Sequence, residues 1–286
     1  MAERTSNLSG IYRFSSIARP IDPAYLTNRT LLIVLPLLAL LSAGLAATHD
    51  MGNGPLGAAL SGALVSFAAW ALTRELAPDH NGAAFVALAI AWTANVVLAT
   101  SSVLLVFVAL VLVRIVNRST GLSARLFDTL SVLGFCIWAT VKLSQPLILL
   151  PAFAAFTLDA ILKNPLRRHH LAAAVCLPVF VWMLVEGVAL ISSDLLAQDW
   201  LLIAVFAGGI IAVVNQSPKP VSYCDTSPDR LDNGRVNAGL IVGFVVAAQA
   251  LLTEGRSEWL ETPIWACFAA VLFSHLAARA KKRPTL

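Results

Sequence analysis

The chain has 286 residues, of which 58% are hydrophobic and only 13% are charged, and its mean hydropathy is +0.79. A soluble domain carries about 25% charged residues, so this composition excludes an ordinary soluble protein and predicts an all-α, polytopic integral membrane protein. The net charge of +4 and the pI near 9.1 come from loop lysines and arginines, which are expected to face anionic lipid rather than nucleic acid.

A polar stretch at residues 1–29 is predicted to form a cytoplasmic N-terminal segment. Ten apolar runs follow it, so residues 30–280 are predicted to form one transmembrane helical domain, ending in a basic cytoplasmic tail at 281–286. The predicted spans are 30–47, 55–73, 83–99, 103–116, 126–144, 146–162, 171–193, 200–215, 238–253 and 263–279. Several have about 16 residues, fewer than the ~20 that cross a bilayer core, so their boundaries are approximate.

The stretch 83–116 is predicted to form two spans, although the turn at 100–102 contains neither Gly nor Pro. As one helix it would be about 50 Å long, which is too long for a bilayer. With ten spans and a cytoplasmic N-terminus, all 20 lysines and arginines except Lys142 and Arg256 fall inside. Because cytoplasmic loops are rich in Lys and Arg, this predicts ten crossings of the inner or plasma membrane with both termini inside. A re-entrant hairpin over 83–116 would give the same arrangement.

Three polar residues inside predicted spans are candidates for substrate or ion coupling: Glu186, Asn95 and His275. Glu186 lies well inside the predicted span 171–193, where a carboxylate costs at least ~2.5 kcal/mol and needs a partner or a water-filled cavity. It is either a proton or cation relay, or a protonated acid that is hydrogen-bonded to a neighbouring helix. A histidine at a position such as that of His275 more often packs and hydrogen-bonds between helices than binds a ligand. Whether His275 and Glu186 meet is left open.

The longest polar interruption is the predicted inner loop 217–237, in which Asp225, Asp229 and Asp232 are spaced four and three residues apart. On a helix these carboxylates would share one face and could hold Mg²⁺ that bridges to a diphosphate. Pro228 interrupts such a helix, and the alternative is a solvated loop with Asp and Pro turns. Membrane prenyltransferases of the aromatic-substrate type carry two Asn-x-x-x-Asp-x-x-x-Asp patterns, and this chain has no such pair.

Other polar groups also fall on the predicted inner side. Arg167 and Arg168 are expected to contact anionic lipid head groups, with phosphate binding as the alternative, because guanidinium forks suit phosphate. Asp159 precedes Lys163 by four residues, the spacing of a helical ion pair. The remaining inner polar residues are Arg74, Glu75, Asp79, His80, Arg114, Arg118, Arg125, Asp128, Asn164, His169 and His170.

Three hypotheses for the function follow. The first is a small-molecule carrier coupled through Glu186, because ten spans in a chain of this length match the layout of drug/metabolite exporters, and carriers commonly have a midplane site. The second is a membrane-embedded lipid- or prenyl-modifying enzyme with Mg²⁺ and a diphosphate at the inner face. The third is a non-catalytic subunit of a homo- or hetero-oligomeric membrane complex. The sequence lacks HExxH, GxSxG and Walker A motifs, and its four cysteines share no CxxC spacing, so no metal site is assigned and catalysis is left open.

Overall fold

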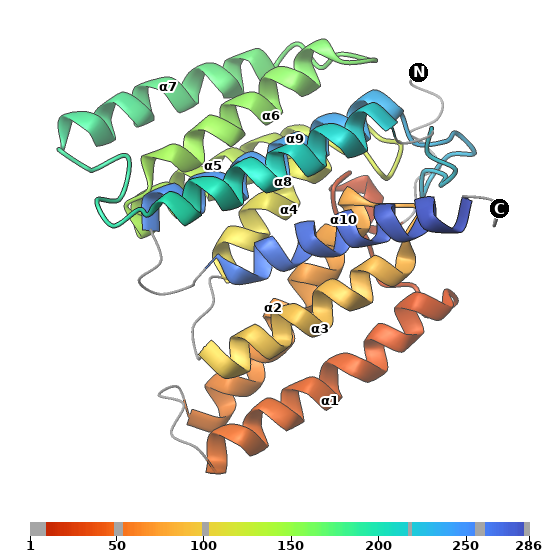
Figure 1. Cartoon of the computed structure of the whole chain (residues 1–286). Helices are drawn as coiled ribbons and strands as arrows, with labels where there is room; N and C mark the ends of the chain where they lie inside the picture. Colours follow the sequence, from red (N-terminus) through yellow and green to blue (C-terminus); the bar gives the residue numbers. More distant parts are fainter. Residues whose placement is uncertain (1–9, 49–53, 99–102, 217–218, 255–260, 283–286) are drawn as a thin grey trace.

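The computed structural model describes residues 10–48, 54–98, 103–216, 219–254 and 261–282. These residues form ten α-helices and two short 3₁₀ helices, and the described part of the chain contains no β-strand (Figure 1). The elements are η2 (Gly10–Arg13), α1 (Leu26–Thr48), α2 (Gly54–Leu76), α3 (Asn81–Leu98), α4 (Val103–Asn117), α5 (Leu126–Leu143), η3 (Pro146–Ile148), α6 (Leu149–Ile161), α7 (His169–Val185), α8 (Ala197–Gln216), α9 (Asn233–Glu254) and α10 (Thr262–Lys282). The prediction of an all-α protein is confirmed.

Seven of the described helices are long and apolar enough to cross a membrane. They are α1, α2, α3, α5, α8, α9 and α10. The other three helices, α4, α6 and α7, are equally apolar but shorter, with 15, 13 and 17 residues. Each predicted span corresponds to one helix, because an unbroken apolar run of this length satisfies its backbone polar groups in lipid only as a helix.

The stretch 83–116 forms two separate helices, α3 and α4, and the residues that join them, 99–102, lie outside the described part. The described residues of α3 and α4 do not contact each other. Helix α3 packs against α2 and α10, whereas α4 packs against α9, α2 and α6. A re-entrant hairpin would pack its two arms together, so this geometry supports two independent helices.

Helix α7 ends earlier than the predicted span 171–193. Gly187 adopts a left-handed φ of +77°, its N–H donates to the carbonyl of Leu184 at 3.0 Å, and the Val188 N–H donates to the carbonyl of Met183 at 3.1 Å. These two bonds form a Schellman motif, the common stop signal in which glycine takes the left-handed position at no steric cost. Glu186 is therefore the C-cap of α7.

Helices α2, α4 and α9 form the centre of the bundle. Helices α4 and α9 approach closely at Gly239, where an added Cβ would lie 2.0 Å from the side-chain oxygen of Asn117. By contrast, few of the leucine, isoleucine and valine side chains of α1 and α8 are buried. A helix that is apolar all round and exposed requires an apolar solvent. Among the described helices, α8 contacts only α9 and α10.

Candidate functional site

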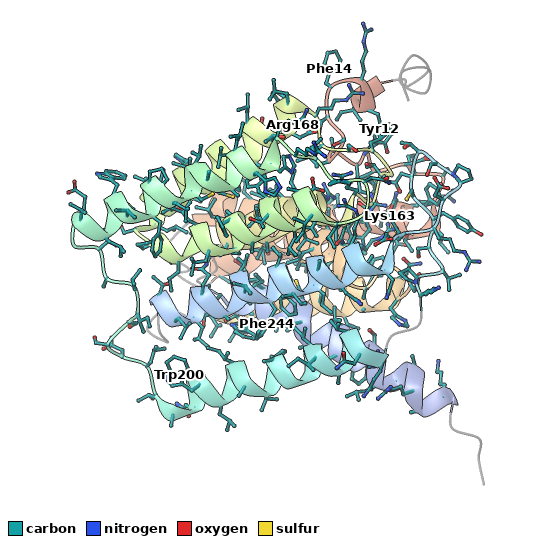
Figure 2. All side chains as sticks on the ribbon, turned by 90° about the horizontal axis from the view of Figure 1, so that it is seen from above. Tyr12, Phe14, Lys163, Arg168, Trp200 and Phe244 are labelled. Atoms are coloured by element: carbon teal, nitrogen blue, oxygen red, sulfur yellow. The ribbon has the colours of Figure 1, made fainter. Side chains whose placement is uncertain are left out.

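The N-terminal segment and the connections after α2, α4, α6 and α8 meet at one end of the bundle. Thr120 joins two of them, because its hydroxyl donates to the carbonyl of Ser16 at 2.7 Å and its carbonyl accepts the N–H of Thr226 at 3.1 Å. Figure 2 shows Lys163 at this end and Trp200, which belongs to α8, at the opposite end. We call this end the polar end, and define it by the segments 10–25, 77–80, 118–125, 162–168 and 219–232.

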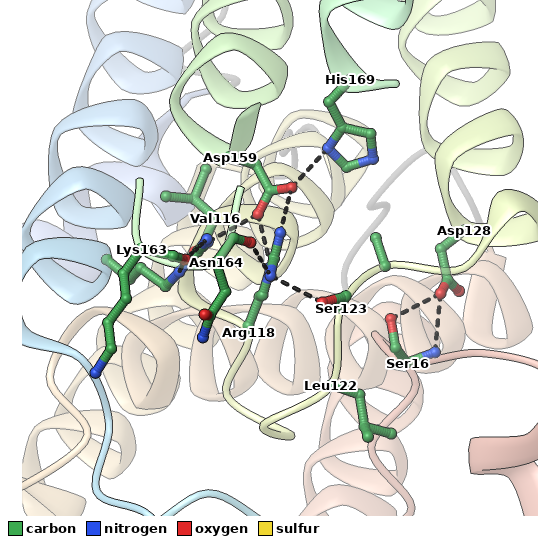
Figure 3. A network of polar contacts seen from close by, with 12 residues as sticks. Ser16, Val116, Arg118, Leu122, Ser123, Asp128, Asp159, Lys163, Asn164 and His169 are labelled. Carbon is green, nitrogen blue, oxygen red and sulfur yellow. Dashed lines mark hydrogen bonds and ion pairs between the residues drawn. The ribbon is translucent and has the colours of Figure 1, made fainter. Parts of the chain in front are cut away.

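A fully buried carboxylate, Asp159 of α6, lies at the centre of a charge cluster at the polar end (Figure 3). Arg118 donates to both of its oxygens at 2.7 and 2.8 Å, and Arg235 donates to Oδ1 at 2.7 Å. The Nδ1 atom of His169 lies 2.8 Å from Oδ2. Asp159 thereby joins α6, α7, the start of α9 and the segment after α4.

The other donors of the two guanidinium groups are bound by carbonyl groups and by the hydroxyl of Ser123. Arg235 donates to the carbonyl of Val116 at 2.8 Å and to that of Lys163 at 2.6 Å, and Arg118 donates to the carbonyl of Asn164 at 2.9 Å. Cations at these positions satisfy a last-turn carbonyl of α4 and two carbonyls in the connection that follows α6, and they complement the dipoles of both helices. Lys163 contributes its carbonyl, and the predicted ion pair between Asp159 and Lys163 is replaced by longer-range partners.

A second buried carboxylate, Glu75 near the end of α2, binds Arg19 and Arg114 at 3.0 and 3.1 Å. Arg19 also donates to both oxygens of Asp225, at 2.6 and 2.7 Å. Burial alone would lower the pKa of Arg19, but the charges of Glu75 and Asp225 outweigh it, so the pKa is raised above its ordinary value. Arg19 therefore fastens the N-terminal segment to α2 and to the segment 219–232.

A third buried carboxylate, Asp128, caps the start of α5. It accepts hydrogen bonds from the hydroxyl of Ser15 at 2.6 Å, from the N–H and hydroxyl of Ser16 at 2.9 and 2.8 Å, and from the N–H of Arg125 at 2.8 Å. A carboxylate at the third position of a helix is favourable for its dipole and its free N–H groups. Two of these donors are serines of the N-terminal segment, so the helix cap also anchors that segment.

A fourth carboxylate, Asp79 in the turn after α2, holds the segment 219–232. It accepts the N–H groups of Val221 and Ser222 at 3.0 and 2.8 Å and the hydroxyl of Ser222 at 2.6 Å. Partial burial alone would raise the pKa of Asp79, but the hydrogen bonds from Ser222 and Val221 outweigh it and the pKa is lowered. Asp79 is therefore ionised near neutral pH, with its oxygens already hydrogen-bonded.

The three aspartates of the predicted loop do not converge. Asp225 binds the Arg19 guanidinium, Asp229 accepts from a serine hydroxyl two residues before it, and Asp232 accepts the N–H of Arg235 at the start of α9. No group of three or more His, Cys, Asp or Glu side chains is arranged to hold a metal ion within the described residues. The shared helical face on which the Mg²⁺ prediction depended is not formed, because residues 225–232 precede the helix and bend through Pro228.

A cavity of about 380 Å³ lies beside the polar end, between the turn after α2 and the ends of α8, α9 and α10. Its polar lining includes Asp79, His80, Asn237, His275 and Arg279. Its apolar lining comes from the same helices: Leu76, Val213, Val236, Leu240 and Val271. A concave site of this size, with mostly apolar walls and a few polar groups, is typical of small-molecule binding sites.

The structure separates the three residues predicted to couple substrate or ions. Glu186 lies exposed as the C-cap of α7 and accepts a hydrogen bond from Nε1 of Trp182 at 3.1 Å, so it does not lie within a helix as predicted. Asn95 is buried in α3 and its amide donates to the Ser61 hydroxyl of α2 at 3.4 Å. His275 lines the cavity. Glu186 and His275 do not meet, because α7 and α10 do not contact each other.

The two arginines predicted to bind phosphate or lipid lie between α6 and α7. Both Arg167 and Arg168 are exposed at the polar end, and Arg168 donates to the carbonyl of Ala124. Their position is compatible with contact to anionic head groups, and neither of them lines the cavity.

Sequence reasoning missed how the buried polar groups pair. Glu75, Asp79 and Asp159 were recognisable as acids beside apolar runs, but their partners Arg19, Ser222 and Arg118 are separated from them by 56, 143 and 41 residues. The one local signal was Gly187, whose position directly after Glu186 marks a helix end. Comparison with protein-family models, with curated proteins and with solved structures finds no match for this chain.

Proposed function

We propose that this chain is a small-molecule carrier of the inner or plasma membrane, that it crosses the bilayer ten times, and that its polar end faces the cytoplasm. The seven long apolar helices and the three shorter ones support the crossings. Hydrogen bonds join the described connections after α2 and α4 to the N-terminal segment and to the segment 219–232, and another joins the connection after α6 to that after α4. These contacts support the alternation of helix directions. The concentration of Lys and Arg in these segments supports the cytoplasmic assignment.

The observation that carries the proposal of binding is the cavity of about 380 Å³ beside the polar end. The carrier takes up its substrate there, and not at Glu186. Helix α8 forms one wall through Val213 and Gln216, and it packs only against α9 and α10 among the described helices. A wall with few neighbours can move at small energetic expense, which a site that must open requires.

A carrier fits this geometry better than a metal-dependent enzyme of the inner face. The carboxylates that such an enzyme would use, Asp225, Asp229 and Asp232, are each engaged by a different protein donor. The cavity lining does not include them. A non-catalytic subunit has no need of a cavity with polar groups from four segments.

The proposal is tested by native mass spectrometry of the detergent-purified protein. Ala278→Trp places an indole in the cavity, whereas Ala280→Trp adds the same group to an exposed position two residues along α10. We expect a small molecule to co-purify with the wild type and with Ala280→Trp, and to be lost from Ala278→Trp. Equal occupancy in all three proteins would contradict binding in the cavity. Equal melting temperatures of the two variants would show that the loss does not come from unfolding.

A further inference from the structure

The three helices that line the cavity change from apolar to polar in the same direction. On α10 the lining residues Val271, His275 and Arg279 follow one another at intervals of four, which places them on one face of the helix. On α9 Leu240 lies deeper in the bundle than Asn237, and on α8 Val213 lies deeper than Gln216. The cavity therefore has an apolar inner part and a polar part near the polar end.

The polar part contains side-chain hydrogen-bond donors that have no partner among the described residues. His275 has a buried Nε2 atom with no hydrogen-bond partner among the described residues. Arg279, Asn237 and Gln216 also line the cavity, and the hydrogen bonds and ion pairs of the described residues include none from their side chains. A guanidinium, amide N–H groups and an imidazole beside an apolar surface are more favourable when an anion accepts from them.

The carboxylate of the lining does not compete for these donors. Asp79 already accepts three hydrogen bonds from Val221 and Ser222, which belong to the segment 219–232. His80, the next residue in the chain, also lines the cavity and adds no carboxylate to it. The groups that face the open space thus favour a negatively charged ligand.

We propose that the cavity binds an acidic amphiphile, with its carboxylate or phosphate head held by Arg279 and His275 and its apolar tail directed past Val271 and Leu240. This inference rests on the proposed function, which needs only that some small molecule binds in the cavity. The distance along α10 from Arg279 to Val271 is eight residues, about 12 Å at 1.5 Å per residue. A molecule with one acidic end and a chain of about this length matches both parts of the lining.

Four twelve-carbon compounds that differ only in their head groups test the inference: dodecanoic acid, dodecyl phosphate, dodecanol and dodecylamine. Binding to the purified protein is measured by native mass spectrometry and by the rise in melting temperature with ligand concentration. We expect one or both acids to bind at least about tenfold more tightly than the alcohol and the amine, since a charge-assisted hydrogen bond contributes about that factor or more. Preference for one acid over the other identifies the head group as carboxylate or phosphate.

Arg279→Gln should weaken the binding of the acids about tenfold to a hundredfold and leave the binding of dodecanol unchanged. Arg13→Gln is the matched control, because Arg13 is an exposed arginine of the polar end that does not line the cavity. His275→Gln is a second variant. It replaces the imidazole by an amide, which is still a hydrogen-bond donor, so it should weaken the binding of the acids less than Arg279→Gln does. Unaltered acid binding in Arg279→Gln would overturn the assigned contact.

The outcomes separate this inference from the proposed function. Equal binding of all four compounds, each blocked by Ala278→Trp, would overturn the preference for acids and leave a general binding cavity. If none of the four binds while Ala278→Trp still loses its co-purified molecule, the acidic amphiphile is wrong and the cavity remains a site. If none binds and Ala278→Trp matches the wild type, both proposals fail.

Discussion

Buried carboxylates determine the structure of the polar end at the level of single residues. Glu75, Asp128 and Asp159 are at most 2% exposed, and each binds groups from at least one segment that is distant in the sequence. The segments they hold are too polar to be fixed by apolar burial. Because a buried charge is tolerated only when it is paired and hydrogen-bonded, each carboxylate specifies one arrangement of its neighbours.

Replacing Asp159 by asparagine should destabilise the protein strongly. The change removes the negative charge between Arg118 and Arg235 and leaves two buried guanidinium groups without compensation. Breaking a buried ion pair by removing one partner costs about 3–5 kcal/mol. We expect a large decrease in the melting temperature of the detergent-purified protein, measured beside the wild type.

The matched control for Asp159→Asn is Asp194→Asn, which makes the same chemical change at an exposed aspartate in the connection between α7 and α8. This control should change the free energy of unfolding by less than about 0.5 kcal/mol. Similar melting temperatures for the two variants would mean that the Asp159 cluster does not stabilise the fold.

The hydrogen bonds of Asp79 should make the segment 219–232 sensitive to acid. The pKa of Asp79 in the folded protein lies below its ordinary value of 3.8, so ionised Asp79 stabilises this segment fully at every pH above about 4. That contribution is lost as the pH falls through the lower folded pKa. Hydrogen-exchange protection of the Val221 and Ser222 amides, corrected for intrinsic exchange, should therefore stay constant from neutral pH down to about pH 4 and decrease as the pH falls further.

An internal control for this effect is the amide of Thr226, which belongs to the same segment but donates to the carbonyl of Thr120. Its protection should be independent of Asp79. Asp79→Asn should lower the protection of Val221 and Ser222 at neutral pH and abolish its acid dependence. An acid response that persists in Asp79→Asn would assign the titration to another group.

At the scale of single residues the sequence showed which residue types interrupt the apolar runs, but not which side chains contact one another. Asp159 and Lys163 have the spacing of a local ion pair, yet Asp159 binds Arg118 and Arg235 from other segments. Local spacing failed here because a bidentate guanidinium in a buried site competes better for a carboxylate than an exposed lysine does. The helix end before Glu186 was not predicted, because the apolar residues on both sides of Glu186 outweighed the glycine that follows it.

At the scale of helices, α4 and α9 pack most closely at Gly239. Gly239→Ala would place a methyl group 2.0 Å from the Oδ1 atom of Asn117. Asn117 is 3% exposed, and its amide donates to the carbonyl of Glu75 at 2.8 Å. We expect a loss of about 1–3 kcal/mol in stability from overpacking, measured as a lower melting temperature.

Gly134→Ala in α5 is the matched control, because an added Cβ there meets no atom within 4 Å. In an open helical position alanine is favoured over glycine by about 0.5–1 kcal/mol, so this variant should melt at a slightly higher temperature. The two substitutions are chemically identical and should act in opposite directions. A lower melting temperature in both would mean that the close approach of Asn117 to Gly239 does not distinguish the two sites.

The helices themselves were the most predictable elements, because runs of apolar residues have only one way to satisfy their backbone in lipid. The predicted break within 83–116 agrees with the separate helices α3 and α4, although no Gly or Pro marks it. Ends were less predictable, as α9 begins at Asn233 and the predicted span began at 238. The start of α9 was not predicted because it contains the polar residues Asn233 and Asn237. Both of these residues line the cavity.

At the scale of the whole molecule, the positive charge and the buried ion pairs gather at the same end of the bundle. The described segments that gather at the polar end contain most of the described arginines. Two buried carboxylates, Glu75 and Asp159, hold four arginines in ion pairs at this end or in the adjoining helix ends: Arg19, Arg114, Arg118 and Arg235. Lys142 lies exposed near the other end, at the end of α5. The same residues thus supply much of the positive charge of one end and fix its structure.

The proposed topology depends most on α7, whose 17 residues span about 25 Å, slightly less than the ~30 Å of a bilayer core. If α7 and the loop after it cross the membrane, positions 167 and 198 lie on opposite sides. Single cysteines introduced by Arg167→Cys and Gln198→Cys, both at exposed positions, test this in a Cys224→Ser background, since the other three cysteines are buried. In intact cells an impermeant maleimide should label Gln198→Cys at once and Arg167→Cys only after permeabilisation. Labelling in the reverse order would place the polar end outside, and labelling of both positions from one side would mean that α7 does not cross.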